Sequence, residues 1–228
     1  MYLNSTKKKI GEFCSQQAPN NAIIGLGSGT TSEAFIRALG ERHLKENLSI
    51  SCIASSTYSE QLARECGLPL IDQESWEGTI SIVFDGADAI NKKGTAIKGA
   101  GGALVREKIL AQASEKVVIM VDERKWRLSW KKCPLPVAIV PFGAKATLQS
   151  LSEIGCEGTI RMKESTPFVT DDGHWIVDLN TNKIRCSQIA LEKRLKTVPG
   201  LVETGLFLHV ASSIVIGYVD GSIEEFCP

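Results

Sequence analysis

The sequence is poor in histidine and carries no net charge. Its three histidines, His43, His174 and His209, are not spaced as a metal-binding pair, which argues against a zinc hydrolase and against a serine–histidine–acid triad. Lysine plus arginine number 26, and so do aspartate plus glutamate, so the chain lacks the broad positive field of a nucleic-acid-binding protein. We therefore expect no bound metal and no nucleic-acid partner, and acid–base chemistry must rest on carboxylates and lysines.

Long apolar runs and paired cysteines are also missing. No stretch reaches the about 18 apolar residues of a membrane span, and the first nine residues lack the apolar core of a secretory signal. The seven cysteines lie far apart without a Cys-x-x-Cys pair, which is typical of reduced thiols in a reducing compartment. The sequence thus predicts a soluble cytoplasmic protein that does not bind membranes.

The first half of the chain alternates between strand and helix patterns. Continuous apolar strands that alternate with helices are typical of a parallel sheet covered on both faces. We therefore predict an α/β fold with a Rossmann-like parallel sheet and helices on both faces. The expected strands are residues 21–27, 48–54, 79–85 and 116–122, and the expected helices include residues 58–66 and 103–113.

The pattern changes at residues 131–141, which contain three prolines. Prolines break helices and confine strands to sheet edges, so we expect a different architecture from here on. The pattern predicts helices at 145–154 and 189–195, strands at 159–162 and 174–179, and a turn at Asp171-Asp-Gly. We predict that residues 131–199 form a smaller α+β domain, and that 1–130 and 200–228 form the main domain, with the apolar tail 206–218 returning to the main sheet.

Three segments carry polar residues where a predicted strand ends. The first is residues 25–33, Gly-Leu-Gly-Ser-Gly-Thr-Thr-Ser-Glu. Glycines let the backbone approach a ligand, and the start of the next helix presents free N–H groups to an anion. Thr30 and Glu33 also fit a capping box. The segment is interpreted either as a phosphate-binding loop or as a tight turn with an ordinary cap.

The other two segments carry acids and a lysine. Asp85 and Asp88 flank the end of the strand 79–85, where paired acids can hold sugar hydroxyls or move protons; the alternative is a solvated Asx turn. Lys98 precedes three glycines, and Glu107 lies in the second turn of the predicted helix 103–113. The alternative for Glu107 is a surface acid paired with neighbouring cations. Because parallel strands end at one edge, we expect all three segments to meet there.

These residues resemble the type A ribose-5-phosphate isomerase family. The resemblance runs nearly from end to end, and an ordered set of motifs is far more specific than one glycine loop. The motifs are Gly25-Leu-Gly-Ser-Gly-Thr-Thr, Asp85-Gly-Ala-Asp88, Lys98-Gly-Ala-Gly-Gly-Ala-Leu, Arg106-Glu-Lys108, Val121-Asp-Glu-Arg-Lys125, Pro134-Leu-Pro-Val-Ala-Ile-Val-Pro141 and Val198-Pro-Gly-Leu-Val-Glu-Thr-Gly-Leu-Phe207.

The resemblance implies an aldose–ketose isomerase that interconverts ribose 5-phosphate and ribulose 5-phosphate in the pentose phosphate pathway, without metal or cofactor, as a homodimer or homotetramer. Glu107 matches the proton-shuttling base, Lys98 the cation that stabilises the enediolate, and Asp85 and Asp88 the acids that hold sugar oxygens and help to open the ring. The implied sugar-phosphate contacts are Lys7, Ser28, Gly29, Thr30, Thr31, Asp85, Gly86, Ala87, Asp88, Lys98, Gly99, Ala100, Gly101 and Lys125.

The chain departs from the family pattern at four positions. Ala89 and Ala138 replace usual acids, Arg124 a usual small residue, and Ala100 a usual glycine. None removes a proposed catalytic group, but Ala100 and Arg124 can alter loop shape or substrate fit.

Three other functions compete with the isomerase. A sugar-phosphate sensor of related fold would carry a helix-turn-helix module, for which about 20 residues before the first strand leave too little room. A CoA transferase that uses a glutamate nucleophile would not need the lysine loop or the Asp85–Asp88 pair. A dinucleotide-binding dehydrogenase is disfavoured by the Gly-x-Gly-x-Gly spacing and by the missing acid after residues 48–54.

Overall fold

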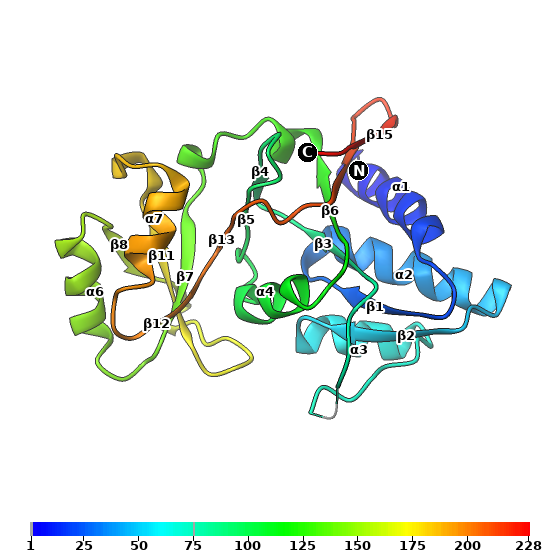
Figure 1. Ribbon diagram of the computed structural model, residues 1–228, viewed down its shortest axis with the longest axis horizontal. Coiled ribbons are helices and arrows are strands. Elements are labelled where there is room, and N and C mark those ends of the chain that lie inside the picture. Colours follow the sequence, from blue (N-terminus) through cyan, green and yellow to red (C-terminus); the bar gives the residue numbers. More distant parts are fainter. Residues whose placement is uncertain (1, 75) are drawn as a thin grey trace.

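The computed structural model describes residues 2–74 and 76–228. Its centre is a six-stranded sheet with the order β15-β14-β6-β3-β1-β2, in which only the edge strand β15 is antiparallel to its neighbour (Figure 1). The predicted parallel sheet is therefore confirmed. The strands are β1 (Ala22–Leu26), β2 (Ile50–Ala54), β3 (Ile82–Gly86), β6 (Val117–Asp122), β14 (Ser213–Gly217) and β15 (Ile223–Phe226).

Helices cover both faces of this sheet because its strands are apolar on both sides. In β6, Val118 and Met120 belong to the cluster formed with three of the helices, whereas Ile119 packs in the cluster on the opposite face. Alternate side chains of a strand point to opposite faces, so one strand supports both layers. The helices on the first face are α1 (Tyr2–Gln17), α2 (Gly29–Glu46) and α3 (Thr57–Glu65), and α4 (Leu104–Gln112) lies on the second face.

The strand order fixes where a ligand can bind. From β1 the chain continues to β2 on one side, whereas from β3 it continues to β6 on the other. Connections that leave in opposite directions open a crevice at the carboxyl ends of the two strands, and open α/β sheets bind their ligands in this crevice. The candidate loops after β1 and β3 border it.

A second, antiparallel sheet has the order β12-β7-β11-β8. Val137 faces a cluster that includes Leu151 and Leu191 from two helices, whereas Ala138 and Ile176 on its other face pack in a cluster shared with β6. This smaller sheet therefore docks against the main unit. Its elements are β7 (Leu135–Ile139), β8 (Gly158–Ile160), β11 (Trp175–Leu179), β12 (Leu201–Thr204), α6 (Ala144–Glu153) and α7 (Gln188–Leu195).

The expectation that prolines confine this strand to an edge is wrong. Pro136 lies in β7, which has a neighbour on each side. Its carbonyl faces the side of β12 and accepts a hydrogen bond from Gly205 N at 2.7 Å. An N–H at this position would face the Gly205 carbonyl, which instead accepts a hydrogen bond from Lys98 N at 2.9 Å, so the proline leaves no acceptor without a donor.

Short elements join the two units. A three-stranded sheet of order β13-β5-β4 lies between them, and the predicted return of the tail to the main sheet is confirmed by β14. β12, a strand of the smaller sheet, lies beyond residue 199, where the smaller domain is predicted to end. The domain boundaries near 130 and 200 stay predictions. Among the described residues, no helix is long and apolar enough to cross a membrane. The remaining elements are β4 (Ala89–Ile90), β5 (Ala96–Ile97), β9 (Met162–Lys163), β10 (Thr166–Pro167), β13 (Leu206–Phe207), α5 (Glu123–Trp126) and two short 3-10 helices at Trp130–Lys132 and Thr181–Lys183.

Candidate active site

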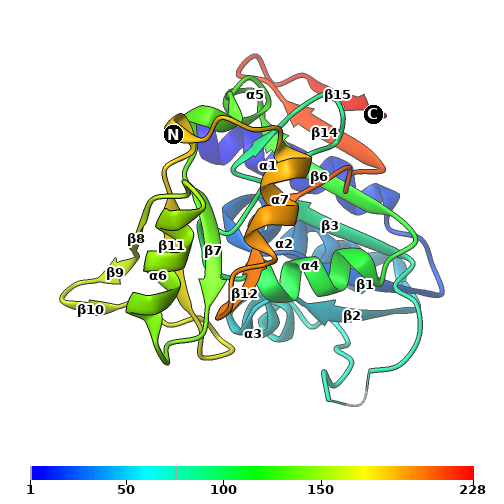
Figure 2. The same cartoon turned by 60° about the vertical axis from the view of Figure 1, so that its left-hand side comes forward.

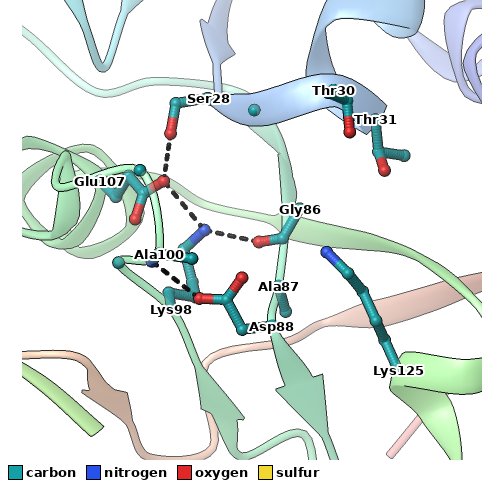
Figure 3. Close-up of a pocket in the computed structure, with 13 residues that line it drawn as sticks. Ser28, Thr30, Thr31, Gly86, Ala87, Asp88, Lys98, Ala100, Glu107 and Lys125 are labelled. Atoms are coloured by element: carbon teal, nitrogen blue, oxygen red, sulfur yellow. Dashed lines mark hydrogen bonds and ion pairs between the residues drawn. The ribbon is translucent and has the colours of Figure 1, made fainter. Parts of the chain in front are cut away.

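A cavity of about 220 Å³ lies in the crevice at the ends of β1 and β3. All three candidate segments meet there. The first two follow β1 and β3, as the shared edge of a parallel sheet predicts, but the third follows β5, which belongs to the separate antiparallel sheet β13-β5-β4. Of the catalytic residues and sugar-phosphate contacts that the family resemblance implies, only Lys7 and Asp85 do not line it. The lining residues are 28–31, 86–88, 98–101, Glu107 and Lys125 (Figure 3).

Glu107 is a buried carboxylate whose two oxygens differ in their surroundings. It lies in the first turn of α4, one turn earlier than expected, and is 4% exposed. Oε1 accepts a 2.5 Å hydrogen bond from Ser28 Oγ and lies 3.3 Å from Lys98 Nζ. Oε2 is buried and has no hydrogen-bond partner within residues 2–74 and 76–228. Burial raises the pKa of Glu107 to about 7, against the opposing effect of the Lys98 charge.

Lys98 is a buried ammonium with three oxygen neighbours. Its Nζ lies 2.9 Å from Asp85 Oδ2 and 3.3 Å from Glu107 Oε1, and it donates to the Gly86 carbonyl at 2.5 Å (Figure 3). An ammonium has three N–H donors, so each donor has an acceptor. Burial alone would lower the pKa of Lys98, but the two carboxylates outweigh it and raise this pKa above its usual value. The cavity therefore contains a fixed positive charge.

Asp85 lies behind Lys98 rather than on the cavity wall. Its carboxylate is almost fully buried, and Oδ1 accepts hydrogen bonds from the backbone N–H groups of Gly86 at 2.7 Å and Ser28 at 3.1 Å. Gly27 makes room for it, since a Cβ at that position would lie 2.1 Å from Asp85 Oδ1. Asp85 thereby holds both the Lys98 ammonium and the loop after β1. Its predicted contact with the sugar stays a prediction.

Asp88 lines the cavity and is hydrogen-bonded to the lysine loop, residues 98–102. Its Oδ2 accepts a hydrogen bond from Ala100 N at 2.9 Å, and its backbone N–H donates to the Ile97 carbonyl at 2.8 Å. A carboxylate anchored through one oxygen in this way can direct the other toward a bound hydroxyl group.

The far end of the cavity is cationic. Thr30 and Thr31 come from the first turn of α2, where backbone N–H groups lack partners within the helix, and Lys125 extends toward them from α5 (Figure 3). Burial lowers the pKa of Lys125, although nearby Asp88 opposes this effect. Hydroxyls, free helical N–H groups and an ammonium together suit a phosphate group.

Lys7 lines an adjoining groove that shares Thr30 with the cavity. Its Nζ donates to Thr30 Oγ1 at 2.7 Å, so it reaches the candidate phosphate end from outside the cavity wall.

The predicted capping box at the start of α2 is wrong. The N-cap is Ser28, and its side chain makes no capping hydrogen bond because its hydroxyl donates to the Glu107 carboxylate. Glu33 pairs instead with Arg37 at 3.2 Å, one turn further along the helix. A residue that usually stabilises a helix end thus serves the cavity, and the helical N–H groups stay open to a ligand.

The neighbours of Glu107 do not pair with it, contrary to the surface-acid alternative. Arg106 bonds Asp172 of the turn before β11 at 2.8 Å. Lys108 donates to Glu203 Oε1 at 2.9 Å and to the Thr204 carbonyl at 2.7 Å, and it pairs with Glu192 of α7 at 3.7 Å. Figure 2 shows the ribbons of α4, β12 and α7. Three consecutive side chains therefore have separate partners: Arg106 contacts the turn before β11, Glu107 lines the cavity, and Lys108 contacts β12.

The smaller unit also contacts the loops around the cavity, which the sequence pattern does not indicate. Asp171, which the sequence predicts only as part of a turn, accepts hydrogen bonds from Thr57 N at 2.8 Å and Thr57 Oγ1 at 3.1 Å. Phe168 packs on the lysine loop, where a Cβ on Gly102 would lie 2.4 Å from its ring. The only available signal was the Asp-Asp-Gly turn itself.

Of the four departures from the family pattern, only Ala100 lines the cavity. Arg124 is 60% exposed and pairs with Asp122 at 3.0 Å. Ala89 and Ala138 are buried in β4 and β7.

Known proteins resemble this chain over nearly its full length. A family model described as ribose 5-phosphate isomerase A (phosphoriboisomerase A) matches residues 51–221. A ribose-5-phosphate isomerase A from Oceanobacillus iheyensis is 38% identical over 214 residues, covering 94% of this chain and 95% of that protein. The structure of ribose 5-phosphate isomerase A from Methanocaldococcus jannaschii has a TM-score of 0.90 at 31% identity and covers 98% of both chains. A D-ribose-5-phosphate isomerase in complex with phospho-erythronic acid has the same TM-score at 29% identity, again with 98% of both chains covered.

These similarities include the segments that form the cavity, and they favour a catalyst over the sugar-phosphate sensor. The fold, the converging loops and the end-to-end similarity agree with one another. This chain belongs to the ribose 5-phosphate isomerase A family, and it is an isomerase.

Proposed function

We propose that ribose 5-phosphate and ribulose 5-phosphate are interconverted in the cavity between β1 and β3, with Glu107 as the base. The observation that carries this proposal is the pairing of two buried groups. Glu107 has one carboxylate oxygen bonded and one without a partner among the described residues, and Lys98 is a fixed ammonium 3.3 Å from the bonded oxygen. A base next to a fixed cation is what proton removal beside a carbonyl requires.

The reaction moves one hydrogen between two carbons. In the open-chain aldose, Glu107 removes the proton from C2, and the electrons of the C–H bond form the C1–C2 double bond of an enediolate while the C1 carbonyl oxygen becomes negative. The protonated carboxyl then returns the proton to C1. The hydroxyl proton on O2 passes to the oxygen on C1, which leaves a carbonyl at C2 and no net change in atoms or charge.

Lys98 supplies the electrostatic stabilisation in this scheme. The negative charge that develops on the enediolate oxygens meets an ammonium already held by Asp85 and by the Gly86 carbonyl. A preorganised charge in a buried site stabilises a transition state without reorganising when the charge develops. Asp88 is assigned to the sugar hydroxyls. The 29% identical relative was solved in complex with phospho-erythronic acid, which also carries a phosphate group.

The phosphate group is assigned to the other end of the cavity. Thr30, Thr31 and Lys125 line that end, and Lys7 reaches it through Thr30. Anchoring a substrate by a group remote from the reacting carbons provides binding energy and sets the position of C1 and C2.

The test is conversion of ribose 5-phosphate to ribulose 5-phosphate by the purified chain in the presence of EDTA, compared with the Glu107→Gln variant. We expect the variant to lose about 10²–10⁴-fold in kcat with KM nearly unchanged, because the amide keeps the shape of the carboxyl but cannot take a proton. Glu115→Gln, at an exposed position just beyond α4, is the matched control and should behave like wild type. A large rise in KM with little change in kcat would remove Glu107 from the base role.

Assembly and location stay predictions from the family resemblance, which implies a cytoplasmic homodimer or homotetramer. Light scattering of the purified chain measures the number of copies.

A further inference from the structure

The lysine loop, residues 98–102, carries two groups that shape the cavity. Lys98 provides the buried ammonium, and Ala100 N donates to Asp88. The loop is an irregular turn in which Gly99 has φ +105° and Gly102 has φ +87°, values that glycine adopts far more readily than other residues. Such a loop needs contacts from outside to hold one conformation.

Phe168 packs on one end of the loop, and a second side chain of the smaller unit provides hydrogen bonds to it. Arg161 lies between β8 and β9, and its Nη1 donates to the Gly99 carbonyl at 3.0 Å and to the Ala100 carbonyl at 2.8 Å. Its Nε and Nη2 donate to the two carboxylate oxygens of Asp178 on β11 at 2.9 and 2.6 Å. The planar guanidinium is therefore fixed by a bidentate ion pair on one side while it holds two successive carbonyls on the other.

Because the peptide unit is planar, the contact with Arg161 also fixes the direction in which the N–H groups of the lysine loop point. None of the described peptide bonds is cis, and a trans peptide directs its C=O and N–H to opposite sides. The Gly99 carbonyl points to Arg161, and the N–H of the same peptide unit, that of Ala100, points to Asp88. The Ala100 carbonyl also points to Arg161, so the N–H of Gly101 points away from the smaller unit. By holding the Gly99 and Ala100 carbonyls on its own side, Arg161 directs the N–H groups of Ala100 and Gly101 away from the smaller unit.

We propose that Arg161 is a positioning residue for the isomerisation: it acts from the smaller unit to hold the lysine loop in the orientation that places Lys98 and the loop N–H groups at the reacting carbons. This inference rests on the proposed function. Arg161 does not line the cavity, so it acts through the loop rather than on the substrate. The candidate phosphate contacts come from α2 and α5, which Arg161 does not touch, so its loss should affect turnover far more than substrate affinity.

The test compares Arg161→Ala and Arg161→Lys with an arginine of similar chemistry elsewhere in the smaller unit. Arg194 on α7 also donates to a backbone carbonyl, that of Ile154, but has no contact with the lysine loop, so Arg194→Ala is the control. We expect Arg161→Ala to lower kcat by about 10²-fold, the scale of a misplacement of about 1 Å, with KM close to wild type. Arg161→Lys should retain part of the activity. Added guanidinium ion should restore part of the kcat of Arg161→Ala, whereas sodium chloride at the same concentration should not.

Hydrogen–deuterium exchange supplies a readout that does not depend on turnover. We expect exchange in a peptide covering residues 98–103 to become faster in Arg161→Ala and to stay unchanged in Arg194→Ala. The inference is overturned if kcat of Arg161→Ala stays within about twofold of wild type, if Arg194→Ala loses kcat equally, or if exchange in the loop does not change. A wild-type chain without turnover counts against the proposed function, and the exchange experiment then still decides whether Arg161 holds the loop.

Discussion

Removing the hydroxyl of Ser28 should shift the pH dependence of the isomerase. Ser28 Oγ donates a 2.5 Å hydrogen bond to Glu107 Oε1, and this bond favours the ionised carboxylate. A hydrogen bond to a charged group contributes roughly 1.5–3 kcal/mol, and about 1.4 kcal/mol corresponds to one pKa unit. Ser28→Ala should therefore raise the pKa of Glu107 from about 7 by about one to two units.

The direction of the activity change follows from the role of the base. Only ionised Glu107 accepts the C2 proton, so kcat/KM falls as the pH drops below the pKa of this carboxyl. With the pKa raised, Ser28→Ala should lose about 5- to 50-fold in kcat/KM at pH 7 and approach wild type at higher pH. Lys98 does not limit activity in this range because its own pKa is raised above the usual value.

The assay is a pH profile of kcat/KM for ribose 5-phosphate, which reports the free enzyme. The second pKa of a phosphate ester, about 6, contributes equally to every variant and cancels in the comparison. Ser28→Thr keeps a hydroxyl and should retain the wild-type profile, and Ser32→Ala removes a hydroxyl that contacts Asp85 at 3.4 Å rather than Glu107. The reasoning is refuted if the acid limb of Ser28→Ala stays in place or moves to lower pH.

Three further perturbations address binding and stability. Lys125→Met should raise KM about 10- to 100-fold, the scale of a hydrogen bond to a charged group, with a smaller effect on kcat; steady-state kinetics that give an unchanged KM would remove Lys125 from the phosphate end. Gly27→Ala should lower the free energy of unfolding by about 1–3 kcal/mol and remove most of the activity, because the new Cβ would lie 2.1 Å from Asp85 Oδ1. Urea denaturation measures the loss, and wild-type stability would contradict the close contact between the Gly27 backbone and Asp85. Phe35→Ala should destabilise the chain by about 3–5 kcal/mol, since the fully buried ring stacks on Phe84 at 4.4 Å between centroids; a loss below about 1 kcal/mol, measured the same way, would contradict this packing argument.

The main sheet could be predicted because its strands carry their own signal. Residues 117–121 are a continuous apolar run, and in the structure Val117–Asp122 is a strand buried on both faces. The meeting of Ser28 and Asp88 could be predicted for a related reason, since β1 and β3 are parallel and the loops after them share one edge. The position of Glu107 could not be derived in this way, because its segment follows β5 of the antiparallel sheet.

Contacts between the two units could not be predicted in the same way. Arg161 reaches carbonyls more than 60 residues earlier in the chain, and no local spacing records such a contact. Pro136 misled the strand prediction because the carbonyl that its missing N–H would have faced, that of Gly205, accepts a hydrogen bond from the distant Lys98 N. The predicted capping box of Thr30 and Glu33 was wrong because the N-cap is Ser28, two residues earlier, and Glu33 pairs with Arg37.

The first turn of α4 also limits how this protein can change over evolution. Arg106, Glu107 and Lys108 each make a connection in a different direction. Successive residues of a helix are separated by roughly 100° of rotation, so inserting or deleting one residue upstream would turn all three side chains away from their partners at once. Single substitutions here remove one connection each, whereas a change in length removes them together. We therefore expect homologous chains to vary in length elsewhere and to keep the spacing between Lys98 and Lys108 constant.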